Sequence, residues 1–416
     1  MKYRYSAIDV TPKLLNINLA GFAKRNAEIQ TFGEGSLYLK FLWLKSSKEN
    51  IIFVTLDTLY FPKDLAIKIT LMLFECYNIR ESEVFFSSTH THSAPNVALK
   101  KFGHICDEYI SILENAARDG VSLLSKGFID CKMELFYKDF NNDMPIIGRR
   151  KTYKIPILRK EVTLMLPNHR QKIDNGIRVI RLSSGSDEFL IYNFSCHPVF
   201  NSNKFISSDF IGAIDKVLVN GNVVGSLFLQ GFCGDIRPKL INSESNTCDI
   251  KGKIKSFLFG DLFRLPNKCD FESFVSFFYK SIKDDISYEK AELTSFSTKV
   301  FTCKFTSISG QLEKIIKVKL FFSLPLVGIS IPAEVLSSYY LSLKERFPNI
   351  IVFPMGYAED MLGYLPHHTD FPLGGYEVNS YENYGWDSPI SVESLANFEE
   401  RLFNEIEKNV YEKGKT

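Results

Sequence analysis

The feature that most constrains the fold is a repeated pattern in which a short, bulky apolar run ends in a polar loop. Each run is brief and bounded by small polar residues, as buried strands are. The runs are 84–86, 189–194, 223–229 and 327–331, and the loops after them hold His90 and His92, His197, Asp235, and Glu334. Loops at strand ends are where α/β proteins place their chemistry. The pattern therefore predicts an α/β protein with polar groups gathered at strand ends.

Amphipathic helices are predicted around these strands. Apolar residues recur at helical spacing in 62–77, 108–124 and 391–408,. Two further strands, 37–44 and 51–59, flank a polar turn,. Strands interleaved with helices predict a mixed β-sheet core with flanking helices. Because no linker or internal repeat divides the chain, we expect a single domain over residues 1–416.

Two expectations concern single segments. The apolar pattern of 335–347 predicts a helix, which would place Glu334 at a helix N-terminus, where the helix dipole favours a carboxylate. Residues 242–270 show few periodic signals and mixed polar composition. Such a stretch predicts a mobile loop, which could act as a lid.

Composition excludes several classes of protein. The chain has 50 basic and 48 acidic residues, interspersed along the sequence, so it offers no electrostatic footprint for nucleic acid. Its eight cysteines form no C-x-x-C pair and are expected to be reduced, mostly buried thiols. No stretch has the roughly 18 uninterrupted apolar residues of a spanning helix, and the N-terminus lacks the apolar core of a secretion signal. We expect a soluble, cytoplasmic protein.

The sequence Thr89-His90-Thr91-His92-Ser93 places two histidines two residues apart. If the strand geometry persists, both rings project from one face and can bind one metal ion. The alternative is a pair of surface or hydrogen-bonded histidines. Paired arginines, Arg149 and Arg150, follow a glycine turn; such arginines are solvated or clamp an anionic or carbonyl group.

An ordered set of motifs resembles the catalytic domain of the neutral ceramidases and their ceramidase-like relatives. The motifs are Asp9-Val10-Thr11-Pro12, Thr89-His90-Thr91-His92-Ser93, Cys196-His197-Pro198, Ser208-Asp209, Gly234-Asp235, Ile331-Pro332-Ala333-Glu334, Gly356-Tyr357 through Gly363-Tyr364, and Gly374-Gly375-Tyr376-Glu377. Each motif alone is a weak signal, but the set runs in order across nearly the whole chain. The resemblance implies a neutral-ceramidase-like α/β domain that carries one zinc ion.

The resemblance also implies roles for individual residues. The implied zinc ligands are His90, His197, Glu334 and Tyr364. The residues implied beside the metal are His92, Asp235 and one of Arg149 and Arg150. Two imidazoles and a carboxylate are ligand types of catalytic zinc, in agreement with the pattern of the loops. Without the resemblance, Tyr364 could equally be a hydrogen-bonded core tyrosine.

Three features depart from the family pattern. Neutral ceramidases carry a serine nucleophile two residues after the Gly-Asp pair, and this chain has Arg237 there. We also expect no counterpart of the C-terminal β-sandwich domain of ceramidases and no secretion signal. A guanidinium cannot be deprotonated near neutral pH, so Arg237 cannot act as the nucleophile.

The sequence therefore predicts a zinc-dependent hydrolase that cleaves an N-acyl or N-acetyl amide of a small molecule, lipid or sugar with a metal-activated water. His92 or Asp235 would accept the proton, and Arg237 would bind the developing oxyanion or an anionic part of the substrate. Three alternatives stay open: Arg237 pairs with Asp235, the same site is an esterase, or the protein binds zinc without catalysis.

Overall fold

The structure is a computed structural model that describes residues 1–13, 17–22, 25–26, 35–47, 49–98, 104–155, 160–242, 250–283 and 288–411. Its largest elements are two five-stranded sheets. The first has the order β6 (Val84–Ser88), β5 (Asn50–Leu56), β4 (Tyr38–Lys45), β1 (Lys2–Asp9), β7 (Ile129–Asp130). The second has the order β13 (Val223–Gln230), β12 (Asp187–Phe194), β11 (Gly176–Ser184), β8 (Lys132–Asp139), β17 (Glu289–Glu292).

A four-stranded sheet lies beside them, and smaller sheets complete the fold. The four-stranded sheet is β18 (Ser297–Thr306), β19 (Glu313–Ser323), β20 (Leu326–Ser330), β22 (Ile351–Met355). The three-stranded sheet is β10 (Lys160–Asn168), β9 (Ile146–Ile155), β14 (Ile236–Pro238). The two-stranded pairs are β2 (Asn18–Leu19) with β3 (Arg25–Asn26), β15 (Ile241–Asn242) with β16 (Leu262–Phe263), and β21 (Glu334–Val335) with β23 (Tyr364–Leu365).

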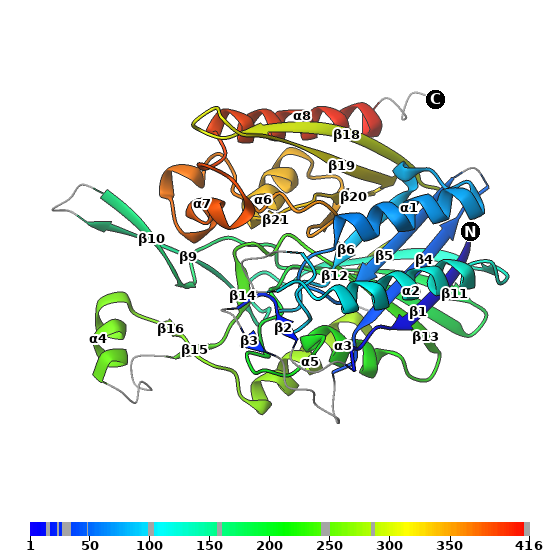
Figure 1. The fold of residues 1–416 in the computed structure, drawn as a ribbon, viewed down its shortest axis with the longest axis horizontal. Helices are drawn as coiled ribbons and strands as arrows, with labels where there is room; N and C mark the ends of the chain where they lie inside the picture. Colours follow the sequence, from blue (N-terminus) through cyan, green and yellow to red (C-terminus); the bar gives the residue numbers. More distant parts are fainter. Residues whose placement is uncertain are drawn as a thin grey trace.

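Helices cover the outer faces of the sheets (Figure 1). The α-helices are α1 (Lys63–Tyr77), α2 (Asp107–Leu123), α3 (Asp209–Leu218), α4 (Ile250–Phe259), α5 (Lys268–Lys283), α6 (Ser337–Arg346), α7 (Tyr376–Asn379) and α8 (Val392–Tyr411). Short 3-10 turns are η1 (Glu81–Glu83), η5 (Phe371–Leu373) and η6 (Tyr381–Tyr384). Among these described helices, none combines the length and apolar character needed to span a lipid bilayer.

Successive side chains of the central strands point into different hydrophobic cores. On β4, Leu42 faces a core shared with the second sheet, whereas Phe41 faces the core beneath α1 and α2. β5 repeats this division with Phe53 and Ile52. Successive strand side chains point to opposite faces, so strands buried on both sides read as continuous apolar runs. The predicted mixed-sheet α/β fold is confirmed.

Each large sheet contains one parallel pair, β5–β6, β12–β13 or β20–β22. The carboxyl ends of these pairs meet. Gly356 N–H, after β22, donates to Gln230 O at 3.0 Å, and Ser88 N–H, at the end of β6, donates to Tyr357 O at 3.0 Å. Gly231 N–H donates to Phe194 O at 3.1 Å. The loops that follow these strands are therefore gathered at one place.

The structure changes two expectations about single segments. α6 begins at Ser337, and Glu334 lies in β21 rather than at a helix N-terminus. Residues 242–270 include α4 and β16, so regular structure occupies part of the expected loop; residues 243–249 lie outside the described residues. Mobility of this segment and the single-domain organisation stay predictions.

The seven cysteines of the described residues are free thiols, as expected. Only Cys196, Cys233 and Cys303 are buried, so the expectation that most are buried is not met among them. Cys248 lies outside the described residues.

Candidate metal centre

The first histidine loop leaves β6 at Ser88, so the strand geometry does not persist to the histidines. His90 has a left-handed backbone conformation with φ of +64°, which is rare for a residue with a side chain. The turn nevertheless brings His92 Nε2 within 3.4 Å of His90 Nε2. The predicted convergence of the two rings is confirmed, but a loop and not a strand face produces it.

A short segment near the N-terminus packs against His92. Gly21 has φ of +100°, and a Cβ there would lie 2.5 Å from His92 Cγ. Only glycine permits this approach. The ring of Phe22 then packs edge-on at 4.8 Å from the His92 ring. This segment fixes one side of His92 and leaves its ring partly exposed.

Backbone carbonyls orient two of the imidazoles. His90 Nδ1 lies 2.8 Å from Leu59 O, and His197 Nδ1 lies 2.6 Å from Cys233 O. A carbonyl oxygen only accepts hydrogen bonds, so each Nδ1 carries the proton and each Nε2 presents a lone pair. This is the tautomer that a metal-binding histidine needs.

Glu334 completes the group from β21. Its Oε1 accepts hydrogen bonds from Tyr60 at 2.5 Å and Tyr384 at 2.7 Å. Its Oε2 is buried without a hydrogen-bond donor and lies 3.5 Å from the Nε2 atoms of both His90 and His197. Three lone-pair donors therefore face one another, and no proton lies between the two imidazoles and the carboxylate.

The spacing of these atoms fits a metal ion. Ligand atoms held about 2.0–2.1 Å from a tetrahedral ion are separated by about 3.3–3.4 Å. Glu334 Oε2 lies 3.5 Å from the Nε2 atoms of His90 and His197, which is close to this value. His90, His92 and His197 form a candidate metal-binding group. A cation would satisfy the orphaned Oε2 and both lone pairs together.

Burial keeps the imidazoles of His92 and His197 neutral. Burial, with the charge of Arg149, lowers the pKa of His197 to about 3. Burial and the two neighbouring histidines hold the pKa of His92 well below its usual value, and the charge of Arg237 adds to this effect. A neutral imidazole can bind a metal ion or accept a proton.

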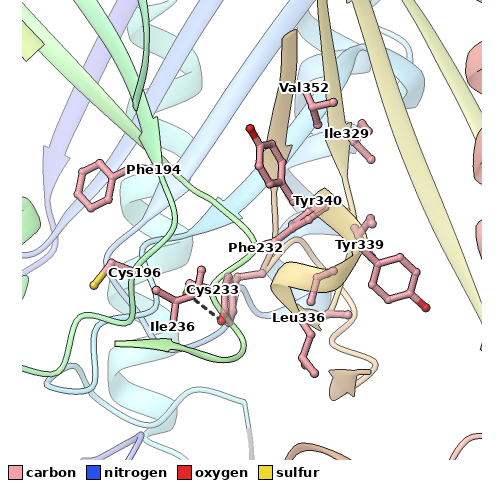
Figure 2. Close-up of a cluster of buried hydrophobic side chains, with 14 of the residues drawn as sticks. Phe194, Cys196, Phe232, Cys233, Ile236, Ile329, Leu336, Tyr339, Tyr340 and Val352 are labelled. Atoms are coloured by element: carbon pink, nitrogen blue, oxygen red, sulfur yellow. Dashed lines mark hydrogen bonds between the residues drawn. The ribbon is translucent and has the colours of Figure 1, made fainter. Parts of the chain in front are cut away.

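The loops rest on an apolar cluster (Figure 2). Cys196, Cys233 and Ile236 lie on one side of it, and Leu336 and Tyr339 lie on the other. The amide of Gln230 ties two loops together by donating to Thr89 O at 3.2 Å and to Cys196 O at 3.0 Å.

The paired arginines clamp a buried carboxylate. Arg149 Nε donates to Glu377 Oε1 at 2.9 Å, and Arg150 donates to Glu377 Oε2 at 2.6 Å. The usual solvated state is therefore wrong for these buried arginines, and the alternative of a clamp holds, with the protein's own Glu377 as the anion. Arg149 also donates to the Tyr364 hydroxyl at 2.9 Å. Tyr364 lies directly beside Glu334 in the β21–β23 pair, and its role as a ligand stays a prediction.

The Asp235 carboxylate faces α6. Its Oδ1 accepts from Ser337 N–H at 2.8 Å, and its Oδ2 accepts from Ser337 Oγ at 2.9 Å and from Gln171 at 2.6 Å. The helix N-terminus that was expected to face Glu334 therefore faces Asp235, where the dipole favours the carboxylate. These contacts favour a positioning role for Asp235 over proton transfer.

Asp235→Asn is expected to lower kcat/KM by less than about tenfold and to retain bound metal. Loss of a proton acceptor costs about 10²–10⁴-fold, whereas loss of a charged hydrogen-bond acceptor at a helix end costs about 1–3 kcal/mol of unfolding free energy. Steady-state kinetics and denaturant unfolding measure the two effects. A kcat/KM loss beyond about 10²-fold in a folded variant would indicate that Asp235 accepts a proton in the reaction.

Arg237 lies on β14 at the edge of the site. Its guanidinium carbon lies 4.8 Å from the centre of the Phe263 ring. Burial, with the charge of Arg149, lowers the pKa of Arg237 to about 10, so the group stays charged at neutral pH. The Asp235 carboxylate is bound by Ser337 and Gln171, and among the described residues no carboxylate forms an ion pair with Arg237. The alternative of an Arg237–Asp235 pair is therefore not observed.

Sequence reasoning missed Tyr60 and Tyr384. Tyr60 lies in the bend after β5 and Tyr384 ends η6, and no motif singles out either residue; their hydrogen bonds to Glu334 do. Hydrogen bonds that orient a metal ligand are each worth about 10–100-fold in metal affinity. Tyr60→Phe is expected to weaken metal binding by about this factor, as measured by competition with a chelating dye. Tyr77→Phe is the matched control, because the Tyr77 hydroxyl bonds within the α1–α2 packing, to Val121 O at 2.8 Å; an equal loss in both variants would contradict the prediction.

A second cluster contains His367, His368 and Glu399. Thr369 N–H donates to His367 Nδ1 at 3.3 Å, and His367 Nε2 lies 2.8 Å from Glu399 Oε1. The proton is therefore on Nε2 and is shared with the carboxylate. This pattern is that of a hydrogen bond that joins the loop to α8, and it differs from the converging lone pairs around Glu334.

The fold and this centre together define a class of α/β proteins with histidine and carboxylate side chains gathered at strand ends. Among solved structures, neutral ceramidase from Pseudomonas aeruginosa matches with a TM-score of 0.69 and 12% identity, over 97% of this chain and 73% of that chain. A ceramidase complexed with C2 matches with a TM-score of 0.67 and 12% identity, over 97% of this chain and 74% of that chain. The chain thus has a neutral-ceramidase-like fold. No family model matches the sequence, and no curated protein matches it significantly.

Proposed function

We propose that this protein is a zinc-dependent hydrolase of an N-acyl amide. The observation that carries the proposal is the orphaned Glu334 Oε2, which lies 3.5 Å from two imidazole nitrogens whose protons are held elsewhere by backbone carbonyls. Two imidazoles and one carboxylate are the protein ligands of several catalytic zinc sites.

His90, His197 and Glu334 would hold the zinc ion, with Tyr364 as the fourth candidate ligand. When bound, zinc supplies a Lewis acid for the acyl carbonyl and lowers the pKa of a water molecule. His92 is neutral and partly exposed, so its imidazole would take the proton released by the attacking water and return it to the leaving amine.

Arg237 would bind the oxygen on which negative charge develops. Burial and the neighbouring histidines lower the pKa of His92, and the charge of Arg237 adds a smaller contribution in the same direction. A charged donor in a site shielded from water stabilises a developing oxyanion. Arg149, held by Glu377, would keep Tyr364 in place from the other side.

Partly or well exposed aromatic rings lie beside residues of the centre. Phe22 packs against His92, Phe263 lies beneath Arg237, and Tyr376 packs 5.6 Å from Tyr364. All three rings are partly or well exposed. Rings in this position suit an apolar acyl chain, and both structural neighbours carry the name ceramidase. We therefore place a lipid N-acyl substrate ahead of an N-acetyl sugar.

Metal analysis combined with a substrate panel tests the proposal. The purified protein is expected to contain zinc, to hydrolyse N-acyl substrates, to lose activity with a chelator and to regain it with added zinc. Hydrolysis of O-acyl substrates alone would make the protein an esterase, and a zinc-loaded protein inactive on both classes would make it a binding protein. The cytoplasmic location stays a prediction.

A further inference from the structure

The helix α4 exposes an apolar face to solvent. Ile254, Phe257 and Leu258 recur at i, i+3 and i+4, and their exposed fractions are 55%, 85% and 59%. Leu265, in the turn behind the helix, is 78% exposed. Figure 1 shows α4 standing away from the body of the molecule, below the β9–β10 hairpin. Three neighbouring apolar side chains on one exposed helix face indicate a surface that binds a partner.

The sequence of this helix is basic. Residues 250–259 contain three basic residues and no acidic one, although the whole chain carries a net charge of only +2. The three are Lys251, Lys253 and Lys255; the next two basic residues, Arg264 and Lys268, form ion pairs with Asp270 at 2.5 Å and Glu272 at 3.7 Å. A helix that exposes phenylalanine and leucine and whose sequence is rich in lysine has the chemistry of helices that lie in the surface of an anionic membrane.

The same helix is joined to the candidate metal centre. The carbonyl oxygen of Phe259, the last residue of α4, accepts hydrogen bonds from Lys151 at 2.8 Å and Tyr153 at 2.5 Å. Both donors lie on β9, which also carries Arg149. After α4 the chain forms β16, where Phe263 packs beneath Arg237. A surface bound by α4 would therefore be connected, through β9 and β16, to Arg149 and Arg237 of the centre.

We propose that α4 and the following turn dock the protein on an anionic lipid surface, from which an N-acyl lipid reaches the metal centre. The proposal that α4 docks on a membrane is argued from its exposed apolar side chains and its basic sequence. The delivery of substrate rests on the proposed function, so docking is measured by a binding experiment that needs no enzymatic turnover.

A second exposed stripe provides a matched control. On α1, Ile67, Leu71 and Phe74 are 49%, 53% and 54% exposed. This stripe is bordered by ion pairs, such as Lys63 with Asp360 at 2.9 Å, and carries no comparable excess of basic residues. Apolar exposure is similar on the two helices, but local charge differs.

The experiment is sedimentation of the metal-loaded full chain with vesicles of phosphatidylcholine, with or without phosphatidylserine. Binding to the phosphatidylserine vesicles is expected, with a marked decrease at high salt. Phe257→Asp combined with Leu258→Asp should weaken it at least about tenfold, because two exposed apolar anchors are lost and negative charge is added. Lys253→Gln with Lys255→Gln should weaken it about fivefold per lysine. Leu71→Asp combined with Phe74→Asp should bind as the parent does.

Other results would overturn the proposal. These are no binding to phosphatidylserine vesicles, equal binding to pure phosphatidylcholine, or an equal loss in the α1 variant. Sedimentation velocity tests whether a second copy of the chain occupies the surface instead. If the parent protein is an oligomer and the double variant at Phe257 and Leu258 is a monomer, the surface is an interface between copies. Hydrolysis of a water-soluble short-chain N-acyl substrate is measured in parallel. Failure of docking with hydrolysis intact would leave the proposed function standing, and docking without hydrolysis would overturn only the function.

Discussion

Glu334→Gln is expected to lower zinc affinity by more than about 100-fold. Loss of a residue that merely orients a ligand costs about 10–100-fold, and loss of the ligand itself should exceed this range. The amide removes the negative charge that faces two imidazole lone pairs, although its size permits the hydrogen bonds from Tyr60 and Tyr384 to persist. Zinc content after dialysis against a competing chelator measures the effect.

Glu83→Gln is the matched control, because Glu83 is also a buried carboxylate but pairs with Arg80. It should keep its zinc. His90→Ala and His197→Ala should also lose the metal, whereas His92→Ala should retain it and lose rate, since a proton acceptor is not needed to hold the ion. Full zinc occupancy in Glu334→Gln or His90→Ala would contradict the assignment of the ligands.

Arg237→Ala is expected to lower kcat/KM by about 10²–10³-fold while zinc stays bound. This is the range for removal of one donor that stabilises a developing oxyanion. Arg237→Lys should recover only part of the loss, because an ammonium group lacks the planar pair of donors of a guanidinium. Arg118→Ala, at an exposed arginine that contacts Asn115 at 3.0 Å, should leave kcat/KM unchanged.

The presence of Arg237 also leads to a prediction about the number of chemical steps in hydrolysis. With an arginine where the ceramidase pattern has its serine, hydrolysis should proceed in one step without a burst of released amine. Rapid-quench kinetics and mass spectrometry of the protein during turnover test this course. A covalent acyl adduct on a serine or cysteine would rule out direct attack by water.

Local patterns in the sequence determined most of the elements. The apolar spacing of 62–77 indicated α1, and the uninterrupted apolar run 84–86 indicated β6. Both signals depend on residues close in sequence, because helical and strand periodicity repeat within a few positions. The polar loops after the strands were equally visible, since a change from bulky apolar to small polar residues is local. His90, His92, His197 and Glu334 were therefore named from the sequence.

Tertiary structure alone decided what surrounds these residues. Tyr60 and Glu334 are 274 positions apart and Arg149 and Glu377 are 228 apart, yet each pair is in hydrogen-bond contact. No periodicity links residues at such distances; the crossing of three sheets brings them together. The same packing placed the N-terminus of α6 against Asp235, left Arg237 without an acidic partner among the described residues, and joined the end of α4 to β9 through Lys151 and Tyr153. Contacts of this kind follow from how sheets and helices bury their apolar faces, which a local pattern does not encode.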